Sequence, residues 1–201
     1  WIVPNAYAFA PTTPEPPASP CRLLFVGTLN YFPNSEGVAW FMETIWPRVR
    51  AELGDGVALD LVGLHPPRAI RALGEQAGIT VAANVPSVDP YYTAANIVIA
   101  PLHAGSGTRI KLIEAAAKRR AIVTTSLGCE GLGFVDGVHA EIADDPADFA
   151  ARIVALARDA GRRAKLADAC RELAKATFLQ EAVIRDLQNQ IARTLPAPMA
   201  P

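Results

Sequence analysis

The sequence has almost no excess of charge of either sign, since 19 Lys and Arg residues stand against 20 Asp and Glu residues and leave a formal net charge of −1. A protein that holds nucleic acid needs a basic face for the phosphates, so this balance argues against a nucleic-acid partner. Long hydrophobic runs are also missing. No window approaches the roughly twenty apolar residues of a membrane-spanning helix, so we expect no transmembrane segment.

Cysteine is scarce as well. Cys21, Cys129 and Cys170 are far apart, and no histidine stands near them at a metal-binding spacing. This pattern argues against a disulfide framework and a structural zinc site, and it predicts a reduced chain in the cytoplasm. Cys129 lies in a glycine-bearing loop, but a nucleophilic cysteine needs a neighbouring base, and the sequence places no histidine beside it.

The composition predicts a folded domain, because apolar residues make up 51% of the chain and charged residues only 19%. The chain opens with Trp1 and the apolar phrase WIVPN, so we interpret it as a piece of a longer protein. Prolines at positions 11, 14, 16, 17 and 20 favour an extended course. We therefore expect residues 1–20 to be an interdomain linker.

Short apolar runs predict strands, and apolar residues at spacings of three and four predict helices. Strands are expected at residues 23–26, 57–62, 79–85, 97–99, 121–123 and 139–143. Helices are expected at about 34–49, 67–77, 88–95 and 108–119, followed by three helices after residue 145. In the first helix, Asn34 or Ser35 is the expected N-cap, and Pro47 is expected to bend or shorten the helix.

This alternation of strands and helices predicts a doubly wound, Rossmann-like parallel α/β sheet with a helical C-terminal extension. We expect residues 21–180 to form the α/β domain and residues 181–201 to form a last helix and a frayed tail. An apolar stripe runs along that helix at positions 183, 187, 191 and 195. The stripe either packs on this domain or crosses toward a missing half, and in the second case the chain would self-associate through it.

The stretch from residue 96 to 131 organises the chain, because it predicts two strands joined by one helix and hence a right-handed parallel unit. Ligands collect at the carboxyl ends of such strands, here at loop 103–107. Gly105 and Gly107 allow an anion to approach the backbone, and the following helix start offers unpaired N–H groups. Arg109 and Lys111 add positive charge, and Glu114 can accept hydrogen bonds from sugar hydroxyls. Together they indicate a pocket for a nucleotide or a nucleotide sugar.

A simpler interpretation of the same residues remains open. Lys111, Glu114 and Lys118 share one helical face, and Glu114 with Lys118 has the favourable i, i+4 order. A solvated charge stripe would explain all three residues. Loop 103–107 is likewise compatible with an ordinary strand-to-helix turn, since G-x-G alone is a weak signal.

Several motifs, in order and spacing, resemble those of one family. They are FVGTLNYFPNSEGVAWFMETIWP, then LVG, VPSVDPYYTAANIVIAPL, GSGTRIKLIEAAA and VTTSLGCEGL. Over residues 22–180 the chain is similar to the C-terminal, donor-binding domain of group 1 glycosyltransferases of the two-domain GT-B fold. The opening VPN also resembles the passage between the two domains of such enzymes.

The resemblance implies roles for residues at matching positions. Glu114 matches the second glutamate of the family's paired motif, which accepts hydrogen bonds from the nucleotide ribose. The diphosphate would meet Gly27 and Thr28 after the first strand and the helix start. The backbone around Val85 and Val88 would frame the base. The full set of expected donor-binding residues is Gly27, Thr28, Val85, Val88, Gly105, Ser106, Gly107, Thr108, Arg109, Ile110 and Glu114.

The chain departs from the family pattern at two places. The first glutamate of the pair should stand eight residues before Glu114, and that position is Ser106. The contact usually made to the donor sugar is therefore in question. The basic pair that many members carry after the first strand is missing, and Asn30, Tyr31 and Asn34 stand there instead. Arg109 and Lys111 are then the candidate catalytic cations.

By this resemblance, the chain is the donor half of a glycosyltransferase that acts in cell-surface polysaccharide synthesis. Its substrate is a nucleoside diphosphate sugar, and its partner is a missing N-terminal acceptor domain that would also hold it at the inner membrane. Fixed N–H donors and cations can stabilise the departing phosphate without a divalent metal, so no cofactor is expected. The family further implies retention of the anomeric configuration. The isolated chain is expected to be folded but inactive or nearly so.

Other function classes stay open at this point. A sugar-nucleotide epimerase or hydrolase would use the same scaffold for another reaction, and a non-catalytic interaction module would explain the loss of a glutamate at Ser106. A dinucleotide oxidoreductase is the weakest alternative, because no G-x-G-x-x-G follows the first strand.

Overall fold

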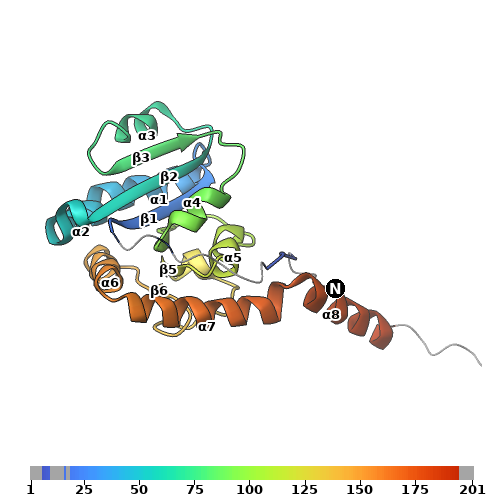
Figure 1. The fold of residues 1–201 in the computed structure, drawn as a ribbon. Coiled ribbons are helices and arrows are strands. Elements are labelled where there is room, and N and C mark those ends of the chain that lie inside the picture. The colour runs from blue at the N-terminus through green and yellow to red at the C-terminus, as the bar shows by residue number, and fades with distance from the viewer. Residues whose placement is uncertain (1–5, 10–15, 17–18, 195–201) are drawn as a thin grey trace, which may run out of the picture.

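The computed structural model describes residues 6–9, 16 and 19–194, and a six-stranded parallel sheet forms its centre (Figure 1). The order of the strands is β3-β2-β1-β4-β5-β6. Their bounds are β1 Cys21–Thr28, β2 Val57–Leu64, β3 Ile79–Ala83, β4 Ile97–Ala100, β5 Ala121–Thr124 and β6 Glu141–Ile142. This is the predicted doubly wound arrangement. The chain reverses direction across the sheet between β1 and β4, where a crevice opens at the carboxyl ends of the strands.

Helices cover both faces of the sheet because the central strands are apolar on both sides. In β1, Leu23 and Phe25 face one helical layer, whereas Leu24 and Val26 face the other. The first layer contains α1 (Phe32–Trp40), α2 (Trp46–Leu53), α3 (Arg68–Leu73) and α6 (Pro146–Arg158). The second layer contains α4 (Asp89–Ala94), α5 (Ile110–Ala117) and α7 (Ala160–Phe178).

The first helix differs from its prediction at both ends. It begins at Phe32 with Tyr31 as N-cap, so neither Asn34 nor Ser35 caps it. Pro33 lies in the first turn, where a missing N–H costs nothing. A π-helical turn, η1 (Phe41–Ile45), precedes Pro47, and there the Trp46 N–H reaches back to the Phe41 carbonyl. Because Pro47 has no N–H to donate to the preceding turn, the helix widens at this point and continues.

Other boundaries are set by backbone conformations that the hydrophobic pattern does not encode. The β3 strand ends at Ala83 because Asn84 has a positive φ of 53°. The α5 helix starts at Ile110, not Thr108, since Gly107 has a φ of 87° and Arg109 is not helical. It ends two residues before Arg119, which has a φ of 56°. Helix α3 and strand β6 are likewise shorter than their predicted ranges.

The N-terminal end of the described chain lies at the junction between α7 and α8 (Gln180–Thr194). The Tyr7 N–H donates to the Phe178 carbonyl at 2.8 Å, and Tyr7 packs against the second apolar layer. This contact lies within the predicted linker 1–20, most of which falls outside the described residues.

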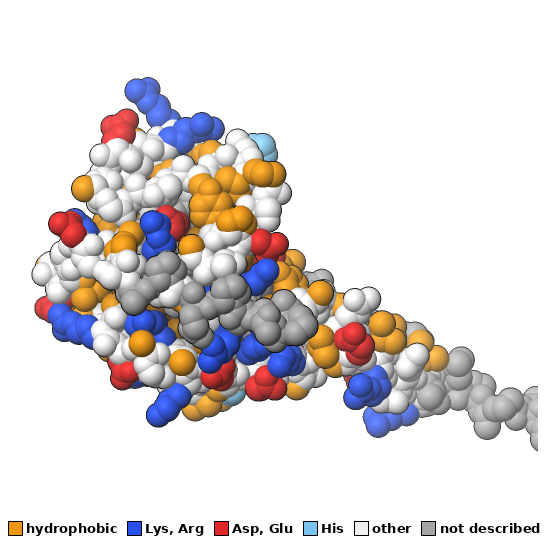
Figure 2. All heavy atoms as spheres, in the orientation of Figure 1, with side chains coloured by type: hydrophobic (Ala, Val, Ile, Leu, Met, Phe, Trp, Pro, Cys, Tyr) orange, Lys and Arg blue, Asp and Glu red, His pale blue; other side chains and the backbone are white. Residues whose placement is uncertain are grey.

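Helix α8 extends beyond the body of the domain (Figure 1). Val183 is buried, but Ile184 is 47% exposed, and Figure 2 shows apolar side chains among charged ones along this helix. Residue 195, the last position of the predicted stripe, lies outside the described residues. None of the helices that the structure describes is long and apolar enough to cross a membrane.

Candidate functional site

A cavity of about 360 Å³ opens at the carboxyl ends of β1 and β4, between the starts of α1 and α5. It lies at the switch point of the sheet, where open α/β sheets bind their ligands. Its lining combines apolar side chains with one lysine, one arginine and one carboxylate. The lining residues are Val26, Gly27, Thr28, Tyr31, Pro33, Asn34, Leu102, Ser106, Thr108, Arg109, Ile110, Lys111 and Glu114.

Lys111 supplies the cation of this cavity. Its Nζ donates to the Asn34 Oδ1 at 2.7 Å and lies 4.3 Å from the centre of the Phe25 ring. Burial, followed by the nearby charge of Arg109, lowers the pKa of Lys111 from 10.5 to about 7, and Glu114 opposes that change. An anion in the cavity would favour the protonated form of this amine.

Asn34 is held in place by the loop that follows β1. Its Nδ2 donates to the Thr28 carbonyl at 2.9 Å, which turns Oδ1 toward Lys111. A Cβ atom at Gly27 would lie only 2.8 Å from that Nδ2. A glycine near the end of β1 therefore leaves room for the side chain that contacts Lys111.

Glu114 lines the cavity one turn further along α5. The hydroxyl of the fully buried Tyr92 lies 3.0 Å from its Oε2. Burial raises the pKa of the Glu114 carboxyl, and the hydrogen bond from Tyr92 counteracts part of that rise. Desolvated carboxylates are good acceptors for sugar hydroxyls, because they gain most from being hydrogen-bonded again.

Arg109 is 8% exposed and mainly holds its own loop together. Its guanidinium donates to the carbonyls of Gly105 at 3.0 Å and Ser106 at 3.3 Å, and it reaches the Leu127 carbonyl at 3.3 Å. It thereby joins the loops that follow β4 and β5. Its Nε is buried and has no hydrogen-bond partner among the described residues.

The start of α5 also presents backbone donors. The Ile110 N–H donates to the Thr108 carbonyl at 2.9 Å. In the described part of the chain, the N–H groups of Thr108, Arg109 and Lys111 donate to no protein acceptor. Several N–H groups and a lysine at one helix start form a suitable site for a phosphate.

A solvated charge stripe does not account for Lys111, Glu114 and Lys118. Lys111 contacts Asn34, Glu114 contacts Tyr92, and Lys118 pairs with Asp89 of α4 at 2.6 Å. The helix therefore uses these three side chains for contacts with other elements. The i, i+4 pair expected from the sequence is replaced by a pair between helices.

The structure brings together most, but not all, of the predicted donor-binding residues. The cavity lining includes Gly27, Thr28, Ser106, Thr108, Arg109, Ile110, Lys111 and Glu114. Gly105 and Gly107 shape the adjoining loop with φ values of 104° and 87°. Val85 and Val88 are outside the lining and pack against the second apolar layer. Sequence reasoning missed Tyr92, although it stands in the motif VPSVDPYYTAANIVIAPL, and it noted Asn34 only as a possible N-cap and as the replacement of a basic residue.

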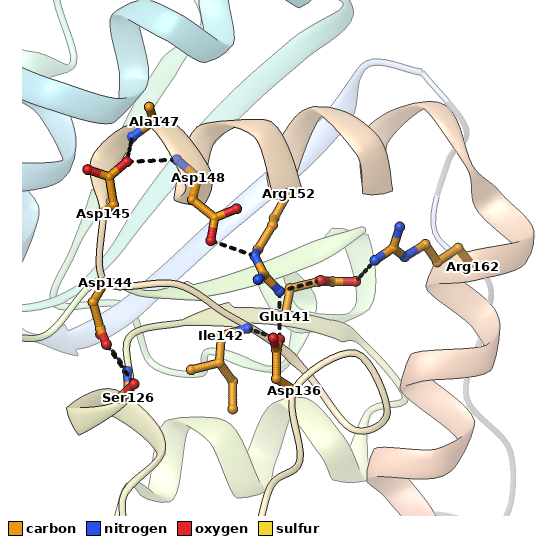
Figure 3. Close-up of polar contacts among 10 residues, drawn as sticks. All are labelled: Ser126, Asp136, Glu141, Ile142, Asp144, Asp145, Ala147, Asp148, Arg152 and Arg162. Carbon is orange, nitrogen blue, oxygen red and sulfur yellow. Dashed lines mark hydrogen bonds and ion pairs between the residues drawn. The ribbon is translucent and has the colours of Figure 1, made fainter.

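A polar network lies beside the site around β6 and α6 (Figure 3). Glu141 is 1% exposed and pairs with Arg152 at 2.9 Å and Arg162 at 2.5 Å. The Asp144 carboxylate accepts the N–H and the hydroxyl of Ser126 at 2.8 and 2.7 Å, and these hydrogen bonds lower the pKa of Asp144. This network fixes the loop after β5, which Arg109 in turn contacts. The residues with described positions contain no cluster of three or more His, Cys, Asp or Glu that could hold a metal ion.

A larger cavity of about 420 Å³ lies between α2 and α6. Its wall is formed largely by alanines, and two of its charged residues, Arg158 and Glu52, pair with each other at 2.9 Å. Unlike the cavity at the strand ends, it offers no converging backbone donors, so we assign the candidate site to the smaller cavity.

Comparison with known proteins agrees with this geometry. The family model described as "Glycosyl transferases group 1" matches residues 20–159. A protein of Klebsiella pneumoniae, named as an uncharacterized 44.6 kDa protein in the cps region, is 28% identical over 141 residues. The match covers 67% of this chain and 36% of that protein.

Two solved structures are similar in fold. The C-terminal domain of the group 1 family protein LpcC from Francisella tularensis is 17% identical with a TM-score of 0.65, over 80% of this chain and 87% of that one. HepE of Anabaena, in complex with UDP and glucose, is 15% identical with a TM-score of 0.67, over 87% of this chain. The match covers 48% of the HepE chain, so this chain spans about half of that protein's length.

Proposed function

This chain belongs to the group 1 glycosyltransferases, and from that premise we propose that it binds a nucleoside diphosphate sugar as the donor half of such an enzyme. The observation that carries the proposal is the convergence of Lys111 and the N–H groups at the start of α5 on one cavity, with Glu114 one turn deeper. Cations and N–H donors suit a diphosphate, and the carboxylate suits the hydroxyls of the attached ribose.

Transfer of the sugar leaves negative charge on the departing diphosphate. In the proposed complex, Lys111 and the N–H groups of Thr108 and Arg109 bind that charge. Such groups are fixed before the reaction, and the loss of one typically costs about 2.7 to 4 kcal/mol in the barrier. Gly27 and Thr28 close the cavity on the side of β1.

The remaining parts of the proposal concern residues and partners outside this site. Val85 lies in the segment between β3 and α4, and Val88 is the N-cap of α4. Their backbone would frame the base. The acceptor would be held by the rest of a longer protein, which would attach the enzyme to the inner membrane from the cytoplasm. Transfer would proceed with retention. The relative in the cps region supports a role in cell-surface polysaccharide synthesis.

A second candidate function is a non-catalytic interaction module, and one observation favours it. Ser106 stands where the resemblance places the first glutamate of the pair. It is exposed and lines the cavity, but its side chain has no carboxylate. A module that had lost catalysis would need neither a cation nor N–H donors at this cavity. A donor domain and such a module therefore differ in whether nucleotide sugars bind.

Calorimetry with UDP-glucose, GDP-mannose and ADP-glucose tests the proposal directly. UDP-glucose is the first probe because the similar HepE structure holds UDP and glucose. We expect one of the three sugars to bind measurably, with affinity lost on Lys111→Met. Absence of binding by all three would refute the donor-site assignment.

A turnover assay separates the reactions that this scaffold supports. Transfer should be undetectable with this chain alone, because in this proposal the acceptor half belongs to the rest of a longer protein. Release of free sugar or its epimer from UDP-glucose in the absence of an acceptor would instead indicate a hydrolase or an epimerase.

A further inference from the structure

Tyr92 contacts two parts of α5 with a single hydroxyl group. Its Oη lies 3.0 Å from the Lys111 carbonyl and 3.0 Å from the Glu114 Oε2. Its ring is 1% exposed and lies in the second apolar layer, so the phenol cannot rotate away to water. Tyr92 itself does not line the cavity, whereas Glu114 does.

We propose that Tyr92 is a positioning residue for the donor site, which holds the Glu114 carboxyl in its cavity-facing orientation and stabilises its ionised form. This inference rests on the proposed function, in which Glu114 accepts the ribose hydroxyls. It adds a residue from α4, the helix that directly follows the loop expected to frame the base. One phenol would thereby connect the base side of the site with its ribose side.

The hydrogen-bond inventory explains how one group can do this. A phenol has one proton to donate, but both the Lys111 carbonyl and an ionised Glu114 carboxylate can only accept. The proton is therefore shared between the two acceptors while Glu114 is ionised. When Glu114 is protonated, its carboxyl can donate to the Tyr92 oxygen, and the phenol proton turns to the Lys111 carbonyl. Both states fit the same heavy-atom positions.

The charges around Glu114 set the direction of the effect. Burial raises the pKa of Glu114, and the hydrogen bond from Tyr92 lowers it again. The other groups that face this carboxyl come from α4, α5 and the N-terminal segment: Asp89, which raises its pKa, Lys118 and Lys111, which lower it, and Tyr7. Loss of the Tyr92 hydroxyl alone should therefore raise the pKa of Glu114 further.

The first experiment measures Glu114 in the ligand-free chain. The carboxyl carbon is followed by ¹³C NMR from pH 3 to 8 in the parent and in Tyr92→Phe, and its resonance is assigned by its disappearance in Glu114→Gln. We expect a higher pKa in Tyr92→Phe. The control is Tyr91→Phe on the same helix, because the Tyr91 hydroxyl makes no hydrogen bond among the described residues. An unchanged Glu114 pKa in Tyr92→Phe would overturn the inference.

The second experiment measures binding of UDP-glucose, whose diphosphate has no titrating group in the range used. At pH 6 we expect Tyr92→Phe to bind about tenfold more weakly than the parent, as for a lost hydrogen bond to a charged group, and the difference should shrink at pH 8. A tyrosine that only fills space would give equal affinities at both pH values, since Phe preserves the ring. That result would also overturn the inference.

The two experiments separate this inference from the function on which it rests. If the parent binds no nucleotide sugar, the proposed function fails, and with it the role of Tyr92 at a donor site. The NMR titration would still show whether the phenol stabilises the carboxylate. If the parent binds and only the Tyr92→Phe prediction fails, the donor site stands and the role of Tyr92 is refuted.

Discussion

The ammonium nitrogen of Lys111 lies 2.7 Å from the side-chain oxygen of Asn34, so a cation that starts on α5 ends beside the loop that follows β1. The resemblance to group 1 glycosyltransferases led us to expect a basic pair after β1, where Asn30, Tyr31 and Asn34 stand instead. Here Asn34 stands in the first turn of α1, and Lys111 brings the charge from the opposite wall of the cavity. In the proposed donor site, the two side chains would together take the place of that basic pair.

Substitution of Lys111 should therefore remove nucleotide-sugar binding without unfolding the chain. We expect Lys111→Met to weaken UDP-glucose binding by at least about tenfold, because the methionine keeps the packing over Phe25 but cannot neutralise a phosphate. Calorimetry gives the affinity, and circular dichroism checks the fold. The matched control is Lys118→Met, since Lys118 pairs with Asp89 outside the cavity. Equal affinities of the parent and Lys111→Met would contradict the assignment.

The same lysine should make the stability of the chain depend on pH. The pKa of Lys111 is lowered to about 7 by burial and by Arg109, whereas in the unfolded chain it returns to about 10.5. Between these values the unfolded chain binds a proton that the folded chain does not, so the free energy of unfolding rises with pH in that range. Below pH 7 both states are protonated, and the full cost of the buried charge remains.

Urea denaturation of the parent and Lys111→Met tests this effect. At pH 6 we expect Lys111→Met to be more stable by about 2 kcal/mol, because it buries no charge. This advantage should disappear toward pH 10. A stability difference that stays constant from pH 6 to 10 would show that Lys111 is not desolvated in the folded chain. Loss of binding together with gained stability would identify Lys111 as a residue kept for function.

The fold was predictable because its signals are local. Apolar runs placed all six strands, and the glycine loop before α5 marked the site. Contacts between elements were not predictable in the same way. Helical spacing predicts an ion pair between Glu114 and Lys118. Instead, both side chains contact α4: Lys118 forms an ion pair with Asp89, and Glu114 accepts a hydrogen bond from Tyr92. Which side chains meet across two helices depends on helix packing, and periodicity within one helix does not specify it.

Parts of the candidate site were predictable where the backbone conformation requires glycine. Gly27, Gly105 and Gly107 each permit a close approach or a positive φ, and such positions stand out in a sequence. The start of α5 was expected two residues too early, because Arg109 is not helical and the helix begins at Ile110. The N–H groups of Thr108 and Arg109 therefore belong to the loop, and both residues line the cavity.

The proposed role of Glu114 predicts a specific preference among ligands. The parent should bind UDP about tenfold more tightly than 2′,3′-dideoxy-UDP, because the carboxylate would lose its ribose partners. Glu114→Gln should reduce that preference and leave the affinity for the dideoxy analogue nearly unchanged. Calorimetry at pH 8 favours the ionised form of Glu114, because burial raises the pKa of its carboxyl. Glu172→Gln is the control, since Glu172 lies on α7 and pairs with Lys175. A preference that survives Glu114→Gln would mean that another group binds the ribose.

The buried ion pair beside the site should matter more for stability than an exposed one. Arg152 contacts both Glu141, which is almost fully buried, and Asp136, whose carboxylate also accepts the Ile142 N–H (Figure 3). We expect Arg152→Ala to lower the free energy of unfolding by about 2 kcal/mol, since Glu141 would be left with Arg162 alone. Urea denaturation at pH 7 measures this loss.

The control for this prediction is another arginine from the same helix. Arg158 pairs with Glu52, and both side chains are more than half exposed, at 59% and 60%. Arg158→Ala should therefore cost less than about 1 kcal/mol. Similar losses for Arg152→Ala and Arg158→Ala would show that the network around β6 does not hold the folded domain together.

Helix α8 predicts self-association of the isolated chain. Val183 packs on the domain, but Leu187 and Ile191 are only partly buried and Ile184 is exposed on a helix that extends past α7. Burial of such a stripe against a second copy removes apolar surface from water, so we expect a concentration-dependent dimer in light scattering coupled to chromatography. Leu187→Lys with Ile191→Lys should give a monomer. Asn189→Lys adds a charge on the opposite side of the helix and should still dimerise. A parent chain that is monomeric at all concentrations would contradict this prediction and favour packing of the stripe on its own domain.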